Sequence, residues 1–328
     1  MEVALSFIGA SFRTMLAPIF ILVLVSYGAN FDPAQAQTSD SQTKAGEALL
    51  QSGKPSEARA LFESILIANA GNGEAQQGEI AASERLALDA RQAGHPDEAL
   101  QDLLRAQGFA SHDPRLLYDL GILEDEMHLY QDADRTLAAV AELQPFNPQV
   151  MYALARVKMD LGQLSLAEEK MQAYLKLQPN DAGAHYGLAR VYQLGLQFEK
   201  ARAEFQRSIQ LQPQQTEAYY QLGDIALGQG AFNEAIGYFS KTLSRDPKHG
   251  GALAGSGQAC FKQKQYSQAE NFLERAVAAA PDYQSGHYYL GLTLARLGRK
   301  EDAQRELDRA TQLAEEQSRK DRGSHLNP

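Results

Sequence analysis

The sequence predicts an all-α fold, a solenoid of about eight helical hairpins, from the regular spacing of its small and apolar residues. A leucine followed by a small residue recurs at intervals of 34 residues or a multiple of 34. These pairs are Leu120-Gly121, Leu154-Ala155, Leu188-Ala189, Leu222-Gly223 and Leu290-Gly291. A period of this length is typical of stacked repeats, each of which contacts only its neighbours, and not of a single globular core.

Seven contiguous units of 34 residues are predicted between residues 80 and 317. They begin at Ile80, Pro114, Pro148, Ala182, Thr216, Gly250 and Gln284. Position 8 of each unit is small, position 20 is always Ala, position 24 is large and apolar, and position 32 is Pro in five of the seven. Small residues let two antiparallel helices approach closely, and bulky residues fill the space beside the contact. Each unit is therefore predicted to be two helices, with the proline in the turn to the next unit.

The expected helix ends carry capping residues and glycines. Asp113-Pro114 and Asn147-Pro148 are each a capping residue followed by Pro, which favours a helix start. Glycine at position 15 is expected to end the first helix in every other unit, at Gly94, Gly162, Gly230 and Gly298. The units in between carry His128, Leu196 and Lys264 at that position.

The unit that begins at Ala182 combines six marker residues, Leu188, Ala189, Tyr192, Ala201, Phe205 and Pro213. With this pattern the sequence resembles the tetratricopeptide repeat (TPR) family over residues 39–317. The resemblance implies a right-handed superhelix whose first helices line a concave groove. It also implies a non-enzymatic protein that binds a protein or peptide there. Ser256 at position 7, in place of Leu, is a local departure from the pattern.

The N-terminal end of the solenoid is expected to be irregular. Residues 37–72 are read as a short flexible leader, 37–42, followed by a degenerate unit that lacks the proline. An insertion, 73–79, separates this unit from the seven regular ones, so the helix after Asn72-Gly73 is expected to be about two turns longer than standard. At the other end, residues 318–328 are expected to form a polar tail.

Residues 1–36 are interpreted as a secretory signal. A short apolar run, Leu16–Val25, follows Arg13 and precedes Ala34-Gln35-Ala36, which has small residues at both positions that a signal peptidase reads. We expect cleavage after Ala36 and an exported protein, periplasmic or secreted. The alternative is an uncleaved anchor in the inner membrane, although the run from Leu16 to Ala29 has 14 residues and a span needs about 20. The chain has no Asn-x-Ser or Asn-x-Thr acceptor, which is consistent with a bacterial origin.

The composition argues against nucleic-acid binding and offers no catalytic motif. The net charge is −10 and basic residues are not clustered, whereas backbone binding needs clustered Lys and Arg. The seven histidines show no metal-ligand spacing, and no cofactor motif is present. Ser256 lacks the strand-to-helix setting of a hydrolase nucleophile. Cys260, the only cysteine, is expected to be a small buried hydrophobe.

Candidate binding residues fall at positions that the family resemblance places in the groove. Position 5 gives a series of tyrosines, Tyr118, Tyr152, Tyr186, Tyr220 and Tyr288. Tyrosine suits peptide binding, although packing between units would explain the series equally well. At position 9, Arg156 and Arg190 could hold an acidic group by forked hydrogen bonds, unless Asp160 simply neutralises Arg156. The leading hypothesis is an interaction scaffold in the cell envelope. The alternative is a docking subunit or regulator of an envelope polysaccharide-synthesis or secretion enzyme complex.

Overall fold

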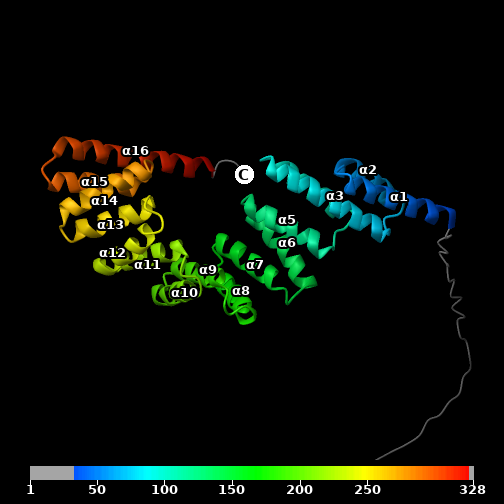
Figure 1. Cartoon of the computed structure of the whole chain (residues 1–328), viewed down its shortest axis with the longest axis horizontal. Helices are drawn as coiled ribbons and strands as arrows, with labels where there is room; N and C mark the ends of the chain where they lie inside the picture. The colour runs from blue at the N-terminus through cyan, green and yellow to red at the C-terminus, as the bar shows by residue number, and fades with distance from the viewer. Residues whose placement is uncertain (1–32, 325–328) are drawn as a thin grey trace, which may run out of the picture.

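The computed structural model describes residues 33–324, and within that range it contains sixteen α-helices and no strand (Figure 1). The helices are α1 (Pro33–Gln51), α2 (Pro55–Ala68), α3 (Gly73–Gln92), α4 (Pro96–Gln107), α5 (Pro114–Glu126), α6 (Tyr130–Leu143), α7 (Pro148–Asp160), α8 (Leu164–Leu177), α9 (Ala182–Leu194), α10 (Phe198–Leu211), α11 (Thr216–Gly228), α12 (Phe232–Leu243), α13 (Gly250–Lys262), α14 (Tyr266–Ala279), α15 (Gln284–Arg296) and α16 (Lys300–Ser324). Consecutive helices pair into hairpins, so the predicted all-α solenoid is confirmed.

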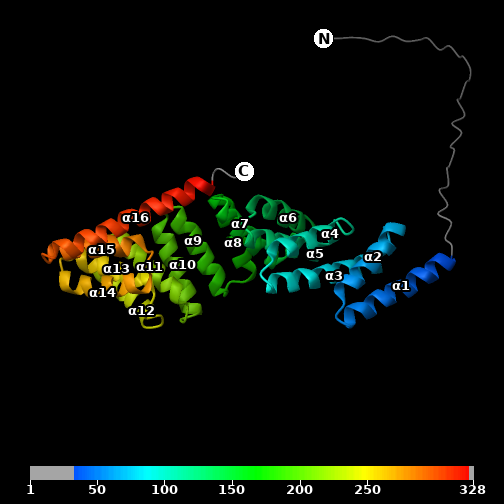
Figure 2. The ribbon, with the colours of Figure 1, turned by 90° about the horizontal axis from the view of Figure 1, so that it is seen from above.

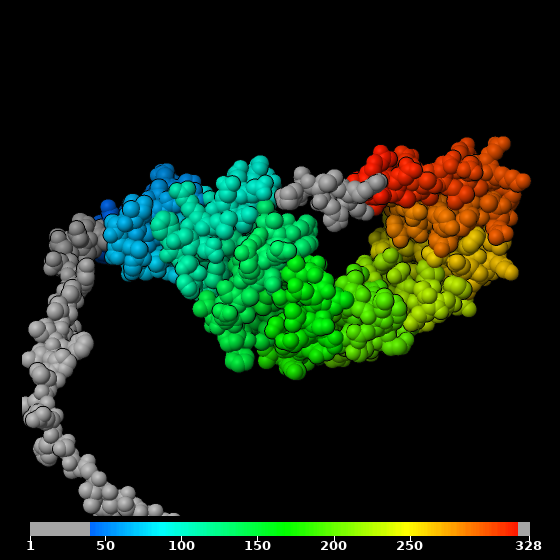
Figure 3. All heavy atoms as spheres, turned by 180° about the vertical axis from the view of Figure 1, so that it is seen from behind, coloured from blue at the N-terminus to red at the C-terminus, as the bar shows by residue number. Residues whose placement is uncertain are grey.

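The hairpins stack into an open arc whose two arms face each other (Figures 1 and 3). Each helix packs on the next helix in the chain. First helices of successive hairpins are also in contact: α5 contacts α7, and α7 contacts α9. Figure 1 shows α5, α7, α9 and α11 on the inner side of the arc and α8 and α10 on the outer side. Seen from above, the hairpins follow one another along the long axis (Figure 2). The first helices therefore line the concave surface.

The seam within each hairpin explains the small residues at positions 8 and 20. A Cβ atom on Gly223 would lie 2.6 Å from the Phe239 ring, and one on Gly257 would lie 2.4 Å from Leu273. In both units the small residue at position 8 faces the bulky residue at position 24. The position-20 alanine is fully buried in the same seam, for example at Ala201. Close packing of this kind leaves no room for another methyl group.

The turns follow the predicted caps. The Asp113 carboxylate accepts hydrogen bonds from the backbone N–H groups of Arg115 and Leu116 at the start of α5. All four glycines predicted to end first helices have positive φ. His128, Leu196 and Lys264 adopt the same left-handed conformation, with φ of 63°, 57° and 63°. The turn geometry is thus shared by every regular unit, and three of them reach it without glycine.

The N-terminal region confirms one expectation and corrects another. Helix α3 has 20 residues, seven more than α5, so the longer helix expected after Asn72 is present. Residues 37–42, expected as a flexible leader, are instead part of α1. An ion pair of 2.9 Å between Asp40 and Lys44 spans one turn there, and Thr43 is buried. The sequence has no proline between Pro33 and Gln51, so the helix that packs on α2 continues through this segment.

The predicted secretory signal lies mainly outside the described part of the chain, which begins at Pro33, and residues 33–36 form the first turn of α1. From residue 33 to residue 324, no helix combines the length and the apolar character needed to cross a bilayer. At the other end α16 has 25 residues, so residues 318–324 of the expected polar tail are helical. One side of α16 buries Ala303, Ala310 and Leu313, while its outward side is polar and closes the end of the stack.

Candidate functional site

A pocket of about 520 Å³ lies on the concave side between α3, α5 and α7. Helix α3 contributes Glu84, Leu88 and Arg91, α5 contributes Tyr118, Asp119 and Ile122, and α7 contributes Tyr152 and Arg156. Three of the sequence-predicted binding residues meet here, Tyr118, Tyr152 and Arg156. Tyr186, Arg190, Tyr220 and Tyr288 do not line this pocket and belong to first helices further along the arc.

Tyr118, Tyr152 and Tyr186 are half-buried, and the last two pack against second helices. The Tyr152 ring lies 5.3 Å from the Tyr174 ring, and the Tyr186 ring lies 5.4 Å from that of Phe205. Burial raises the pKa of Tyr118 and Tyr152, so their hydroxyl groups stay protonated and able to donate a hydrogen bond at neutral pH. These rings therefore stiffen the stack and also present a polar edge to the groove.

Two members of the series have different surroundings. Tyr220 lies 4.7 Å from the His249 ring and 6.0 Å from the Phe239 ring, and burial raises the pKa of its hydroxyl group. Tyr288 is 42% exposed and packs edge-on against its neighbour Tyr289 at 5.2 Å. The series is therefore continuous from Tyr118 to Tyr220 and differs in exposure at Tyr288.

Arg156 is paired with a buried carboxylate of the preceding unit. Its Nη2 lies 3.1 Å from Oδ2 of Asp125, whose side chain is only 4% exposed. Burial raises the pKa of Asp125, and Arg156 opposes that shift. The sequence suggested Asp160 as the partner of Arg156, but the ion pair forms with Asp125 instead. Stacking brings position 12 of one unit opposite position 9 of the next, and this contact between units decides the partner.

Arg190 is attracted to the carboxylate of Asp224, but the two side chains do not form an ion pair. Asp224 occupies position 9 of the next unit and retains solvent exposure. Desolvation by the surrounding protein raises the pKa of Asp224, and the positive charge of Arg190 partly offsets that rise. The two arginines at position 9 therefore differ. Arg156 forms a close ion pair with Asp125, whereas Arg190 interacts with Asp224 only by longer-range charge attraction.

Helix α3 supplies pocket residues that the sequence reasoning missed. Glu84 Oε1 accepts a hydrogen bond of 2.7 Å from Arg115 Nε, and Arg91 Nη2 donates one of 2.6 Å to Glu126 Oε2. Glu84 and Arg91 occupy positions 5 and 12 of their unit, both of which the family resemblance places in the groove. Their positions in the repeat therefore predict a place in the groove, although Glu84 is not a tyrosine and Arg91 is not at position 9. Asp119, at position 6, carried no such signal.

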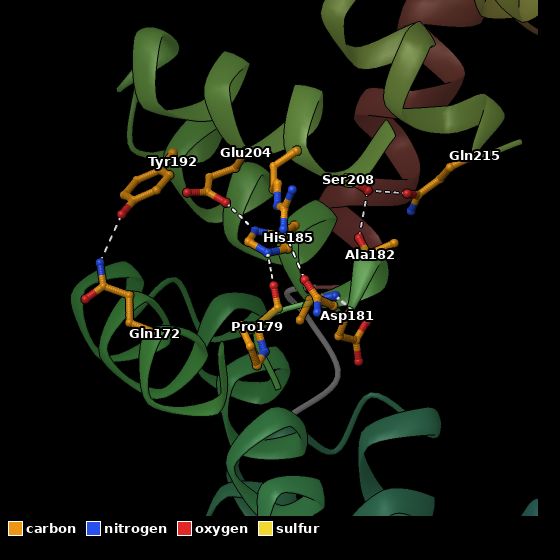
Figure 4. A network of polar contacts seen from close by, with 12 residues as sticks. Gln172, Pro179, Asp181, Ala182, His185, Tyr192, Glu204, Ser208 and Gln215 are labelled. Atoms are coloured by element: carbon orange, nitrogen blue, oxygen red, sulfur yellow. Dashed lines mark hydrogen bonds and ion pairs between the residues drawn. The ribbon is translucent and has the colours of Figure 1, made fainter. Parts of the chain in front are cut away.

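A polar network holds the joint between successive hairpins in the centre of the arc (Figure 4). His185 Nδ1 lies 2.6 Å from Glu204 Oε2, and its Nε2 lies 3.1 Å from the Pro179 carbonyl oxygen. The same arrangement recurs at His287, with Glu306 at 2.6 Å and the Pro281 carbonyl at 2.9 Å. Each histidine therefore connects the two helices of its own hairpin to the turn that precedes them.

Other reactive groups are accounted for by packing. Ser256 is buried, and its Oγ donates a 2.8 Å hydrogen bond to the Ala252 carbonyl oxygen. Cys260 is buried as expected, and burial raises the pKa of its thiol. In the described range no three His, Cys, Asp or Glu side chains gather as a metal site would require. The concave pocket is therefore the main candidate for function.

Stacked helical hairpins around an open concave surface define the class of this protein, an α-solenoid with the architecture of a protein–protein interaction scaffold. Family models described as Tetratricopeptide repeat match residues 118–182, 152–216, 186–250 and 226–292. Together they span more than half of the chain, and the chain belongs to the tetratricopeptide repeat family. No curated protein matches it.

Solved structures share the fold at low sequence identity. A tetratricopeptide repeat protein from Parabacteroides merdae ATCC 43184 is 15% identical with a TM-score of 0.54, over 79% of this chain and 99% of that one. The APC/C hetero-tetramer Cut9-Hcn1 is 15% identical with a TM-score of 0.57, over 85% of this chain and 54% of that one. YrrB, titled a TPR protein with an unusual peptide-binding site, is 20% identical with a TM-score of 0.46, over 56% and 95% of the two chains. The first two likenesses show the fold alone, and the third, with a TM-score below 0.5, adds nothing to that.

Proposed function

We propose that this protein is a non-enzymatic scaffold that binds a segment of a partner protein in the concave pocket between α3, α5 and α7. The observation that carries the proposal is the pocket itself, about 520 Å³ and lined by Tyr118, Tyr152 and the exposed side chain of Leu88. This volume lies within the usual range for ligand sites, roughly 300–1,000 Å³. Half-buried tyrosines bind well because their rings are already held, so little conformational entropy is lost on binding.

The inner surface beyond the pocket suits an extended segment. Tyr186 and Tyr220 continue the line of Tyr118 and Tyr152 on the next two first helices. Neighbouring helices pack about 8–10 Å apart, and an extended chain advances about 3.3 Å per residue. Each unit therefore corresponds to about three residues of a bound segment, and the four tyrosines to a segment of roughly ten.

Photo-crosslinking from two matched leucines tests the site. Leu88 and Leu104 are both 44% exposed, but Leu88 lines the concave pocket whereas Leu104 lines a groove between the second helices α4 and α6. With a photoreactive residue at either position, we expect the partner to crosslink from position 88 and not from position 104. The reverse pattern would place the partner on the outer face and reject this site.

We also propose that the protein is exported and acts in the cell envelope. The support is the apolar run Leu16–Val25 followed by Ala34-Gln35-Ala36. The intact mass of the protein from envelope fractions tests it, since cleavage after Ala36 gives a chain that begins at Gln37. A mass that includes residues 1–36, in a form that needs detergent, would indicate an anchor instead. Identifying the crosslinked partner decides whether the scaffold serves an envelope enzyme complex.

A further inference from the structure

The charges around the concave pocket are unevenly paired. Three guanidinium groups face this region, and each is already bound to a carboxylate. Arg115 is bound to Glu84, Arg91 to Glu126, and Arg156 to Asp125. A fourth carboxylate, Asp119, lines the pocket and makes no ion pair or hydrogen bond within residues 33–324, and the charges of Arg115 and Arg91 reach it only from a distance. The unmatched charge in the pocket is therefore negative.

An acidic ligand would meet strong opposition in this pocket. At Arg156 it would have to share the guanidinium with Asp125, whose charge already offsets that of the arginine. It would also approach Asp119 and Glu84, which have the same sign. These charges weigh against the sequence-derived hypothesis that Arg156 holds an acidic group of the partner, which stays a prediction.

A basic side chain meets complementary groups at Asp119 and the two tyrosines, while the two arginines that line the pocket, Arg91 and Arg156, are each held by a carboxylate. Asp119 is half-buried, and burial raises its pKa, so its charge is less well hydrated than that of an exposed carboxylate. Tyr118 and Tyr152 line the same pocket and offer aromatic rings, which attract cations. Leu88 and Ile122 provide apolar surface against which the methylene stem of a lysine or arginine packs.

We infer that the pocket takes a lysine or arginine side chain of the partner segment, with the charged end at Asp119 and the stem against Leu88 and Ile122. This inference deepens the proposed function and rests on it. The net charge of −10 supports it, because an acidic protein attracts basic segments over distance.

A positional-scanning library of ten-residue peptides tests the inference on the purified protein. We expect the wild-type protein to select Lys or Arg at one position of the bound peptides. The Asp119→Asn variant should bind those peptides about tenfold more weakly or worse, since the negative charge that pairs with the basic group is lost. Asp119→Lys should select Asp or Glu at the same position, which a merely structural role for Asp119 would not produce.

Asp160→Asn is the matched control. Asp160 is exposed, lies on α7 outside the lining of the pocket, and its replacement changes the net charge by the same amount. It should leave peptide selection and affinity unchanged, and neither Asn variant should have a Tm below that of the wild type, because neither carboxylate forms an ion pair within residues 33–324 and burial already disfavours the charge of Asp119.

The possible failures are distinguishable. If peptides bind and crosslink from position 88 but the selected residue is acidic or neutral, the basic-residue inference is wrong and the proposed site stands. An equal loss for the Asp119→Asn and Asp160→Asn variants would also reject the inference, since only general charge would then matter. If no peptide binds and no partner crosslinks from position 88, the proposed function itself fails.

Discussion

Arg156 on α7 forms an ion pair with Asp125 on α5, with Nη2 3.1 Å from Oδ2, although the two residues belong to different repeats. The aspartate side chain is 4% exposed, and that of the arginine is 48% exposed. This pair connects two successive units beside the concave pocket. Replacing Arg156 therefore disturbs the stack as well as the groove.

We expect Arg156→Ala to lower the free energy of unfolding by about 1–3 kcal/mol, because the buried Asp125 carboxylate loses its counter-ion. Adding Asp125→Asn to that variant should restore part of the loss, because the unpaired charge is then removed. Urea denaturation of the two single variants and the double variant forms the necessary cycle. Additive losses would mean that the pair does not couple the two repeats.

Glu79 should make stability depend on pH. It is fully buried in α3, where burial raises the pKa of its carboxyl group to about 7 from an ordinary value of 4.5, partly offset by a 3.0 Å hydrogen bond from Ser83. The native state therefore holds a proton that the unfolded state releases. The stabilisation is complete below about pH 4.5, is lost as the pH rises towards 7, and levels off above that value.

A Glu79→Gln variant should lack this slope and, at pH 8, be more stable than the wild type by up to roughly 3 kcal/mol. Urea midpoints measured between pH 5 and pH 8 provide the comparison. Glu74→Gln is the control, since Glu74 is an exposed carboxylate at the start of the same helix and its loss should leave the slope in place. A slope that persists in Glu79→Gln would assign the titration to another group.

Leu196→Gly should stabilise the protein by about 1 kcal/mol. Leu196 has φ of 57° and is 73% exposed, so its side chain strains the backbone and buries little surface. The control is Leu194→Gly, which places glycine at the last position of α9 and should destabilise by about 0.5–1 kcal/mol. Thermal unfolding of both variants compares them directly. Destabilisation by Leu196→Gly would show that this leucine makes contacts of value to the fold.

Ala201→Leu should damage one hairpin and its neighbours. Ala201 is fully buried in the seam between α9 and α10, so three additional heavy atoms overpack it at a cost of about 1–3 kcal/mol. Because units contact only those beside them, hydrogen exchange should quicken mainly from α7 to α12. Ala203→Leu, at an exposed site on the same helix, should have little effect. Uniform loss of protection along the arc would contradict the nearest-neighbour picture.

The sequence by itself determined the hairpins and their turns, because the physics of both is local. Gly223 and Phe239 lie 16 positions apart within one unit, and the same two positions are in contact at Gly121–Leu137, Gly257–Leu273 and Gly291–Leu307. The cap at Asp113 acts on residues two and three places ahead. Such relations produce a period that is visible without coordinates, and the same period identified the family.

Only the tertiary structure decided how neighbouring units meet. The angle between stacked hairpins brings Asp125 rather than Asp160 to Arg156, places Leu88 of α3 in the pocket, and leaves Asp119 with no ion pair within residues 33–324. It also extends α1 through residues read as a leader. A contact between units depends on the distance and rotation between two helices, and these result from many small packing choices along the seam. The residue pattern of a single repeat does not determine this distance and rotation. The contacts between units in the groove could therefore be assigned only from the tertiary structure.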